Sequence, residues 1–347
     1  MSKVFRVALT GDSFKEGVPV YPDFDLSLLK GTEGIELIPF EEHRPEIGPE
    51  QLDGAQAVIV LTPAVTRASL ARSEDLLVVS RFGVGFEKVD VAACTEADVV
   101  LCTAVGAVDR PVAEATVGWM IALSHNMRMK DRLVREGRWN DRSGLMGSEL
   151  RGRTLGVVGL GGIGRMLVKL LQGFGMNRPL AFDPFLDAGT ASELGVEMVE
   201  LNELMEQADF VSVHCPLNDQ TLDLISHHEL SMMKQTAYLI NTARGGIINE
   251  DALFEALSSN QIAGAALDCF VGEPVTSPHR FGELDNVILA PHSIAWTHEL
   301  FRDIGSVASQ SVIDLAQGRR PRSAINPEVF EKTSFQEKWD RLKIDPK

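Results

Sequence analysis

Three polar side chains follow apolar runs in the second half of the chain. Arg244 follows "LINTA", Glu273 follows "ALDCFVG", and His292 lies in "ILAPHSIAW". Each run is typical of a buried strand, and the carboxyl ends of parallel strands bring ligand-binding side chains to one edge of a sheet. Arginine offers a planar fork to a carboxylate, and histidine exchanges protons near neutral pH, with its charged form favoured by a neighbouring glutamate. If a nicotinamide lies beside them, these residues indicate hydride transfer at a carbinol or carbonyl carbon.

A glycine-rich turn earlier in the chain indicates where such a cofactor would bind. The stretch "GVVGLGGIGRMLVKLLQGFG" places Gly159, Gly161 and Gly164 between an apolar strand and an amphipathic helix. Glycines let the backbone turn tightly and approach a pyrophosphate, whose charge meets the helix N-terminus. The motif alone is often only a tight turn. Here Asp183 ends the next strand about 20 residues further on, as expected for ribose recognition, so we predict a dinucleotide site.

Asp183 also predicts which dinucleotide binds. A carboxylate accepts hydrogen bonds from both ribose hydroxyls but repels a 2′-phosphate. Pro184 and Phe185, which follow it, offer no cation to offset that repulsion. We therefore expect NAD rather than NADP.

Alternating apolar runs and helix-compatible stretches must position these residues. Continuous apolar strands of this kind are typical of parallel sheets covered on both faces. The expected strands are 4–9, 35–40, 57–61, 76–82 and 99–103, followed by a second series at 154–160, 179–183, 210–215, 237–243, 263–268 and 287–292. A long helix is expected from Pro111 to Gly137, and another from Thr297 to Gln317.

These elements predict an α/β protein of two doubly wound parallel-sheet domains with a cleft between them. One is a Rossmann NAD-binding domain over residues 108–296. The other is a flavodoxin-like substrate-binding domain over residues 1–107 and 297–347, discontinuous because the last helix crosses back to it. The charged tail from Asn326 is expected to lie on the surface.

Composition excludes several classes of partner. The chain has 347 residues and a formal net charge of −16, which argues against nucleic-acid and anionic-membrane partners. Four scattered cysteines, no leader-like N-terminus and no bilayer-length apolar run predict a soluble, cytoplasmic protein with reduced thiols. No His, Cys and Asp spacing suggests a metal site. The expected partner is a small anionic substrate.

Several longer motifs together resemble the D-isomer-specific 2-hydroxyacid dehydrogenases. The resemblance runs from about Leu76 to Gly318. Its motifs are "RFGVGFEKVD", "ELRGRTLGVVGLGGIGR", "HCPLNDQTLDLISHHELSMMKQTAYLINTARGGIINEDAL", "GAALDCFVGEP" and "APHSIAW". Their order and spacing make it specific.

The resemblance implies a role for each candidate residue. Arg244 would orient the substrate, Glu273 would be the acid partner of the histidine, and His292 would be the general acid/base. Val84 and Gly85 of the "GVG" loop would bind the substrate carboxylate through backbone N–H groups. Arg244 and His292 would also contact the substrate. The cofactor contacts would be Gly159, Gly161, Gly162, Ile163, Gly164, Asp183, Cys215, Pro216, Thr221, Thr242, Ala243, Asp268 and His292.

The chain also departs from the family pattern. Relatives often carry Asn and Ser where Val108 and Pro111 stand, and His where Ala115 stands, so substrate preference transfers less well than mechanism. Trp296 either shapes the substrate site or packs at a helix entry. Asp109 and Arg110 either reach a distal group of the substrate or form a surface ion pair, the reading we favour.

Purely structural roles for Arg244, Glu273 and His292 are also compatible with the sequence. Arg244 could cap nearby carbonyls or pair with Asp268, Glu273 could be a solvated loop carboxylate, and His292 could be a hydrogen-bonded core histidine. His214 is expected to orient the loop after its strand.

The resemblance leaves alternative functions open as well. One is an NAD(H)-binding sensor like the related C-terminal binding proteins, and another is a phosphite-type dehydrogenase. Formate oxidation is disfavoured because those enzymes carry Gln where Glu273 stands. By family analogy we expect a homodimer built through the cofactor domain and the long helix from Pro111, and no regulatory domain after the last helix.

Overall fold

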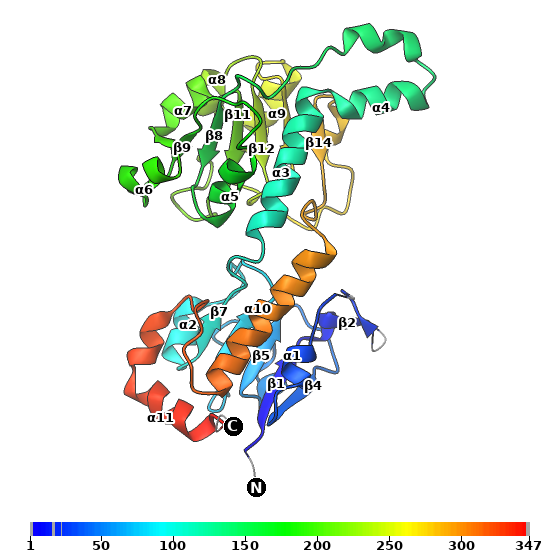
Figure 1. Cartoon of the computed structure of the whole chain (residues 1–347). Helices are drawn as coiled ribbons and strands as arrows, with labels where there is room; N and C mark the ends of the chain where they lie inside the picture. Colours follow the sequence, from blue (N-terminus) through cyan, green and yellow to red (C-terminus); the bar gives the residue numbers. More distant parts are fainter. Residues whose placement is uncertain (1–2, 16–17, 22, 345–347) are drawn as a thin grey trace. The chain divides into compact units, whose positions relative to one another are not determined.

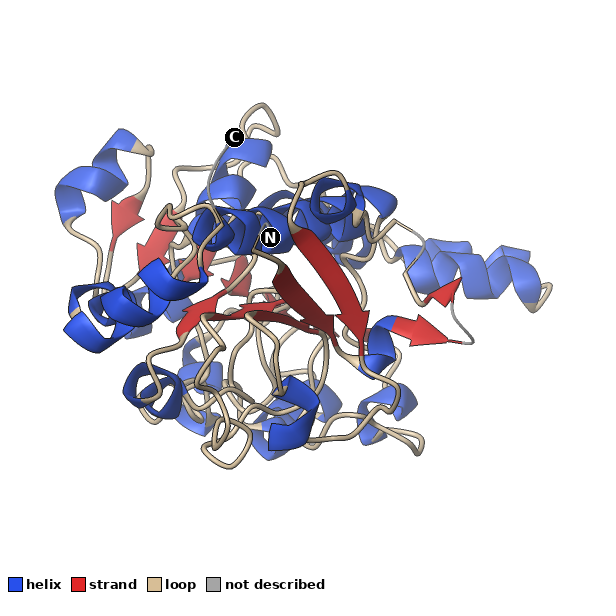
Figure 2. Ribbon diagram, turned by 90° about the horizontal axis from the view of Figure 1, so that it is seen from below, coloured by secondary structure: helices blue, strands red, loops and turns tan. Residues whose placement is uncertain are grey.

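The computed structural model describes residues 3–15, 18–21 and 23–344. The chain divides into two compact units, one formed by residues 1–108 and 297–347 and the other by residues 109–296. Each unit contains a parallel β-sheet flanked by helices (Figures 1 and 2). Among the described residues, no helix combines the length and the apolar character that a membrane crossing requires.

The unit of residues 109–296 contains a seven-stranded sheet in the order β10-β9-β8-β11-β12-β13-β14, with all strands parallel. Its strands are β8 (Leu155–Val158), β9 (Leu180–Phe182), β10 (Glu197–Met198), β11 (Phe210–Val213), β12 (Tyr238–Asn241), β13 (Gly264–Leu267) and β14 (Val287–Leu289). The order reverses at β8, so the carboxyl ends of β8 and β11 form the switch point at which doubly wound sheets bind ligands. This is the Rossmann arrangement that the sequence predicts.

Helices cover both faces of this sheet. The helices of this unit are α3 (Asp109–Ser124), α4 (Met127–Arg135), α5 (Gly162–Leu170), α6 (Ala188–Glu193), α7 (Leu201–Gln207), α8 (His227–Met232) and α9 (Glu250–Ser258). Successive strand residues point to opposite faces. Val157 therefore packs in a core with Met120 of α3 and Leu167 of α5, while Val158 packs with Leu204 of α7 and Leu253 of α9. Burial on both faces explains why the strands read as continuous apolar runs.

The single helix expected from Pro111 to Gly137 is wrong, because the structure has two helices there. α3 ends at Ser124, and α4 begins at Met127. Between them Asn126 adopts a φ of +53°, a left-handed conformation that breaks the helix and that asparagine tolerates better than most residues. The apolar pattern on either side gave no sign of this break.

The other unit contains a five-stranded parallel sheet in the order β4-β1-β5-β6-β7, which is the flavodoxin-like order. Its strands are β1 (Phe5–Leu9), β4 (Ile35–Pro39), β5 (Ala57–Val60), β6 (Val78–Arg81) and β7 (Val100–Cys102). A short antiparallel pair, β2 (Phe14–Lys15) with β3 (Val18–Pro19), lies apart from this sheet and was not expected. The helices of this unit are α1 (Ser27–Lys30), α2 (Val91–Glu96), α10 (His298–Ala316) and α11 (Thr333–Leu342).

The last long helix, α10, completes this sheet from a distant part of the sequence. Ala308 and Val312 of α10 are fully buried, and the Ala308 carbonyl accepts a hydrogen bond of 3.2 Å from Ser80 of β6. Thr297 caps the helix by accepting the Leu300 N–H at 3.0 Å. The unit of residues 1–108 and 297–347 is therefore completed by a helix that lies more than two hundred positions after β6 in the sequence.

The charged tail does not simply lie on the surface, so that expectation is wrong. Phe335 of α11 is fully buried and Phe330 is 2% exposed. Trp339 Nε1 donates to the Leu315 carbonyl of α10 at 2.7 Å. Three aromatic rings spaced along a charged segment therefore form an apolar face, which the overall charge of the tail conceals.

Candidate active site

The glycine turn between β8 and α5 has no room for a side chain at two of its positions. Gly159 has a φ of +93°, and a Cβ there would lie 2.6 Å from the backbone nitrogen of Cys215. A Cβ at Gly164 would lie 2.6 Å from the Gly159 carbonyl oxygen. Gly161, in contrast, has nothing within 4 Å of the position a Cβ would take. The turn is tight where it packs on the protein and open where a phosphate would approach the start of α5.

Asp183, which follows β9, is bonded directly to this turn. Its Oδ2 accepts the Leu160 N–H at 2.9 Å, and its Oδ1 accepts the Phe185 N–H at 3.0 Å. Each carboxylate oxygen keeps a further lone pair for a ribose hydroxyl. The structure thus brings the expected ribose-binding carboxylate and the glycine turn together.

The remaining expected cofactor contacts lie at the ends of β11, β12 and β13. Cys215 follows β11 and abuts Gly159, while the Thr221 hydroxyl donates to the Pro216 carbonyl at 2.6 Å and so closes the loop after β11. Thr242 follows β12 and is 9% exposed, and its buried Oγ1 has no hydrogen-bond partner in the described protein. A buried hydroxyl without a partner is costly unless a ligand or water satisfies it. The open face of the turn, the Asp183 carboxylate and this hydroxyl therefore fit a dinucleotide.

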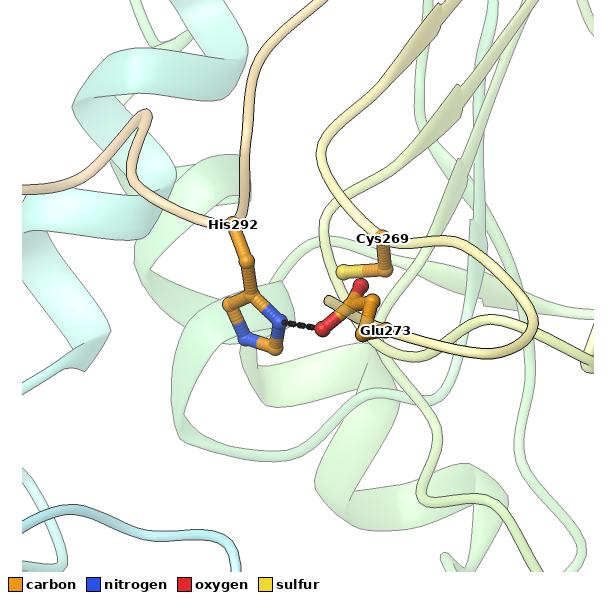
Figure 3. Close-up of side chains that lie close together, drawn as sticks. All are labelled: Cys269, Glu273 and His292. Carbon is orange, nitrogen blue, oxygen red and sulfur yellow. Dashed lines mark hydrogen bonds and ion pairs between the residues drawn. The ribbon is translucent and has the colours of Figure 1, made fainter. Parts of the chain in front are cut away.

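His292 and Glu273 form the most direct contact among the candidate catalytic residues. The Nδ1 atom of His292 lies 2.7 Å from Oε2 of Glu273 (Figure 3). The other carboxylate oxygen, Oε1, accepts the Phe270 N–H at 2.8 Å. Glu273 is thus held from two sides, and it bonds to the imidazole through Nδ1.

This contact changes the proton affinity of both groups. The hydrogen bond and charge of Glu273 raise the pKa of His292 above its ordinary value, although burial and Arg244 oppose the shift. Burial works to raise the pKa of Glu273, but hydrogen bonds from His292 and from the Phe270 N–H lower it below its ordinary value. An ionised carboxylate beside a histidine that gains a proton readily suits general acid/base chemistry.

The segment that carries His292 is held in place by Asp268, the residue after β13. The Asp268 carbonyl accepts the His292 N–H at 2.8 Å, and its carboxylate accepts the N–H groups of Ser293 at 2.9 Å and Ile294 at 3.2 Å. His292 has a φ of +52°, which non-glycine residues rarely adopt. The structure therefore gives Asp268 a positioning role that the sequence did not reveal.

Arg244 follows the end of β12 in a turn that is closed by Asn241. The Asn241 side chain accepts the Ala243 N–H at 3.0 Å and donates to the Arg244 carbonyl at 2.8 Å. The Nη1 atom of Arg244 donates to the Ala243 carbonyl at 2.7 Å, so the guanidinium does cap a carbonyl. A Cβ at Gly245 would collide with the backbone of Phe270, so this glycine is required where the turn packs on the next loop. Asn241, a polar residue at the end of an apolar run, is the sequence feature that could have indicated this turn.

Cys269 lies beside the pair, with its sulfur, a Glu273 oxygen and a His292 nitrogen within 4.8 Å of one another (Figure 3). The thiol donates to the Ala243 carbonyl at 3.2 Å, and burial raises the pKa of Cys269 well above its ordinary value. The Cys269 thiol is thus occupied by a backbone carbonyl, and the other two groups bond to each other. The arrangement favours a proton-exchanging pair over a metal centre.

The expected substrate loop belongs to the other unit and is held by Arg81 of β6. Arg81 Nε donates to the Gly85 carbonyl at 2.8 Å, and Nη1 donates to the carbonyls of Val60, at 2.9 Å, and Leu61. Gly83 has a φ of +139°, with open space where a Cβ would stand. The part played by Val84 and Gly85 in substrate binding stays a prediction.

Other sequence expectations have mixed outcomes. Arg110 forms a surface ion pair, the reading that we favoured, and its partner is Glu114, one turn further along α3, at 2.6 Å. His214 Nε2 bonds to the Ser212 hydroxyl at 2.8 Å, while burial lowers the pKa of His214 to about 4. That histidine is therefore a neutral structural residue.

Comparison with known proteins agrees with this geometry. A model of the NAD binding domain of D-isomer specific 2-hydroxyacid dehydrogenases matches residues 117–293. The D-3-phosphoglycerate dehydrogenase of Methanocaldococcus jannaschii is 38% identical over 279 residues, which cover 80% of this chain and 53% of that protein. The glyoxylate reductase of Thermofilum pendens is 34% identical over 321 residues, which cover 90% and 94% of the two chains. This chain spans about half the length of the D-3-phosphoglycerate dehydrogenases that it matches.

A solved structure extends the agreement to the whole fold. The apo-structure of D-lactate dehydrogenase from Escherichia coli superimposes with a TM-score of 0.74 at 27% identity, covering 92% of this chain and 100% of that one. The motif order, the two sheet topologies and these relatives converge on one assignment. The chain belongs to the D-isomer-specific 2-hydroxyacid dehydrogenase family.

Proposed function

We propose that this protein is an NAD-dependent oxidoreductase that interconverts a small 2-oxo acid and its D-2-hydroxy acid. The observation that carries the proposal is the 2.7 Å contact between His292 and Glu273, in the unit that also holds the glycine turn and Asp183. The family assignment supports a nicotinamide dinucleotide as cofactor. When bound, that cofactor supplies or accepts the hydride.

Residues of the chain bind the substrate and transfer the proton. His292 donates a proton to the substrate oxygen during reduction and removes it during oxidation. Glu273 keeps the imidazole oriented through Nδ1 and favours its charged form. Arg244 binds the substrate carboxylate through its guanidinium, whose planar fork matches the two carboxylate oxygens. We propose that Val84 and Gly85 add backbone N–H groups to the same carboxylate.

NAD is the proposed cofactor rather than NADP. The Asp183 carboxylate is fixed by two backbone N–H groups, so it cannot swing away from a 2′-phosphate without losing both bonds. Pro184 and Phe185 next to it carry no charge, and Phe185 is 87% exposed. A fixed negative charge at this place disfavours the phosphorylated cofactor.

The substrate class is tested with a panel of 2-oxo acids. The names of the relatives suggest glyoxylate, pyruvate and 3-phosphohydroxypyruvate, to which hydroxypyruvate is added. Each acid is mixed with NADH, and NADPH serves as the matched control. We expect at least one acid to be reduced to the D-hydroxy acid, with NADH preferred. Absence of turnover with every acid would overturn the proposal, and a preference for NADPH would overturn the role of Asp183.

We also propose that the protein is a homodimer. In Figure 1, α4 and the turn after it project from the sheet of their unit. This arm exposes four apolar side chains: Met127 (48%), Val134 (63%), Trp139 (63%) and Met146 (85%). Large apolar side chains exposed together on one projecting arm favour an interaction surface, and a second copy would bury them. Sedimentation should give a dimer that the double variant Val134→Asp and Trp139→Asp converts to a monomer; a monomeric wild type would contradict this.

A further inference from the structure

A carboxylate lies beside the open side of the glycine turn that the cofactor's phosphates are expected to approach. Asp109, the first residue of α3, packs against Gly162, the first residue of α5. A Cβ built on Gly162 would collide with the Asp109 carboxylate and lie 2.6 Å from its Cγ. Both residues belong to the unit of residues 109–296, so this contact is internal to one unit.

The two glycines at the start of α5 therefore differ in how much space surrounds them. Gly161 is open, with nothing within 4 Å of a Cβ there, and no side chain caps the helix. Gly162, one residue later, is covered by the Asp109 carboxylate. A helix N-terminus stabilises negative charge, so the first turn of α5 can stabilise either a phosphate or this carboxylate. Asp109 is also in the first turn of α3, which stabilises the charge of its carboxylate as well.

Nothing in the described part of the chain neutralises this carboxylate through a hydrogen bond or an ion pair. Arg110, its neighbour, pairs with Glu114, and Arg165 of α5 bonds through Nε to the Leu160 carbonyl at 3.0 Å. Burial raises the pKa of Asp109, as expected for a carboxyl group without a stabilising partner. The Asp109 carboxylate therefore faces the start of α5 without a positive group from the described residues to offset its charge.

We propose that Asp109 competes with the pyrophosphate of the dinucleotide for the N-terminus of α5 and so weakens cofactor binding. This inference rests on the proposed function, because it concerns the affinity of the same cofactor site. Like charges held at one helix end repel each other, and the bound cofactor must displace the carboxylate or tolerate it. Asp109 is in this way a residue that sets cofactor affinity without touching the reacting atoms.

Binding measurements on the full-length protein test the inference. The dissociation constant of NADH is measured by fluorescence for the wild type, Asp109→Asn and Asp109→Ser, and those of ADP-ribose and adenosine by competition. Glu114→Gln is the matched control, because it removes an acidic group one turn further along the same helix. Melting temperatures show whether each variant is folded.

The expected result is NADH binding about tenfold tighter in Asp109→Asn, with the same gain for ADP-ribose and none for adenosine. Added salt should reduce the gain, and Glu114→Gln should bind like the wild type. Equal or weaker NADH binding in both folded Asp109 variants would overturn the inference, as would an equal gain for adenosine. Failure of the proposed function would look different, since no variant would then reduce any 2-oxo acid.

Discussion

Glu273 contacts His292 through one carboxylate oxygen and the Phe270 backbone through the other, at 2.7 Å and 2.8 Å. The two residues come from loops after different strands, β13 and β14. The backbone bond fixes the carboxylate, and the carboxylate fixes the Nδ1 side of the imidazole. Nε2 is thereby left as the nitrogen that can exchange a proton with a substrate.

The pH dependence of reduction follows from this pair. Glu273 raises the pKa of His292, so the proton-donating form persists to higher pH than for a histidine without such a partner. Reduction should lose rate as pH rises through that raised pKa. Glu273→Gln removes the charge, so the loss should begin at lower pH. Profiles of kcat/KM against pH for both proteins check this, and identical midpoints would show that Glu273 does not tune the histidine.

Arg244 should matter mainly for substrate binding. The Arg244→Lys variant keeps a positive charge but loses the planar fork and the bond from Nη1 to the Ala243 carbonyl. We expect kcat/KM for the 2-oxo acid to fall about a hundredfold while the dissociation constant of NADH changes little. Steady-state kinetics and NADH titration measure the two quantities. A loss confined to NADH binding would assign Arg244 to the cofactor instead.

The tail should contribute to stability through its aromatic residues. Phe335 is fully buried, so Phe335→Ala removes a ring from the core of its unit and should lower the free energy of unfolding by about 3 to 5 kcal/mol. Glu337→Ala, an exposed position on the same helix, is the control and should change little. Urea unfolding measures both. An equal, small effect of the two substitutions would mean that the tail does not support the core.

Much of the architecture could be predicted from the alternation of apolar runs with helix-compatible stretches. Strands buried on both faces have to be continuously apolar, so β8, β11 and β12 were recognised within a few residues of their ends. Gly159 and Gly164 were expected at a tight turn, and a side chain at either position would collide with backbone there. Asp183 bonds to that turn, and its role in binding the ribose stays a prediction. The two sheet orders were expected from the alternation of strands and helices and from the family resemblance.

What the sequence did not reveal depends on backbone conformation and on distant contacts. The break at Asn126 needs one left-handed residue in a pattern that otherwise continues. The bonds from Asp268 to the His292 segment join residues more than twenty positions apart through backbone N–H groups, which carry no sequence signal. The contact of Asp109 with Gly162 was not expected, because the packing of α3 on α5 cannot be read from either helix alone.

The most direct test of the account replaces the proposed general acid/base. His292→Ala removes the imidazole but leaves the glycine turn and Asp183 in place, so NADH should bind within about threefold of the wild type. Turnover with the best 2-oxo acid of the panel should fall by about two to four orders of magnitude. Turnover within tenfold of the wild type, in a variant that still binds NADH, would contradict the assignment of His292 as the proton donor.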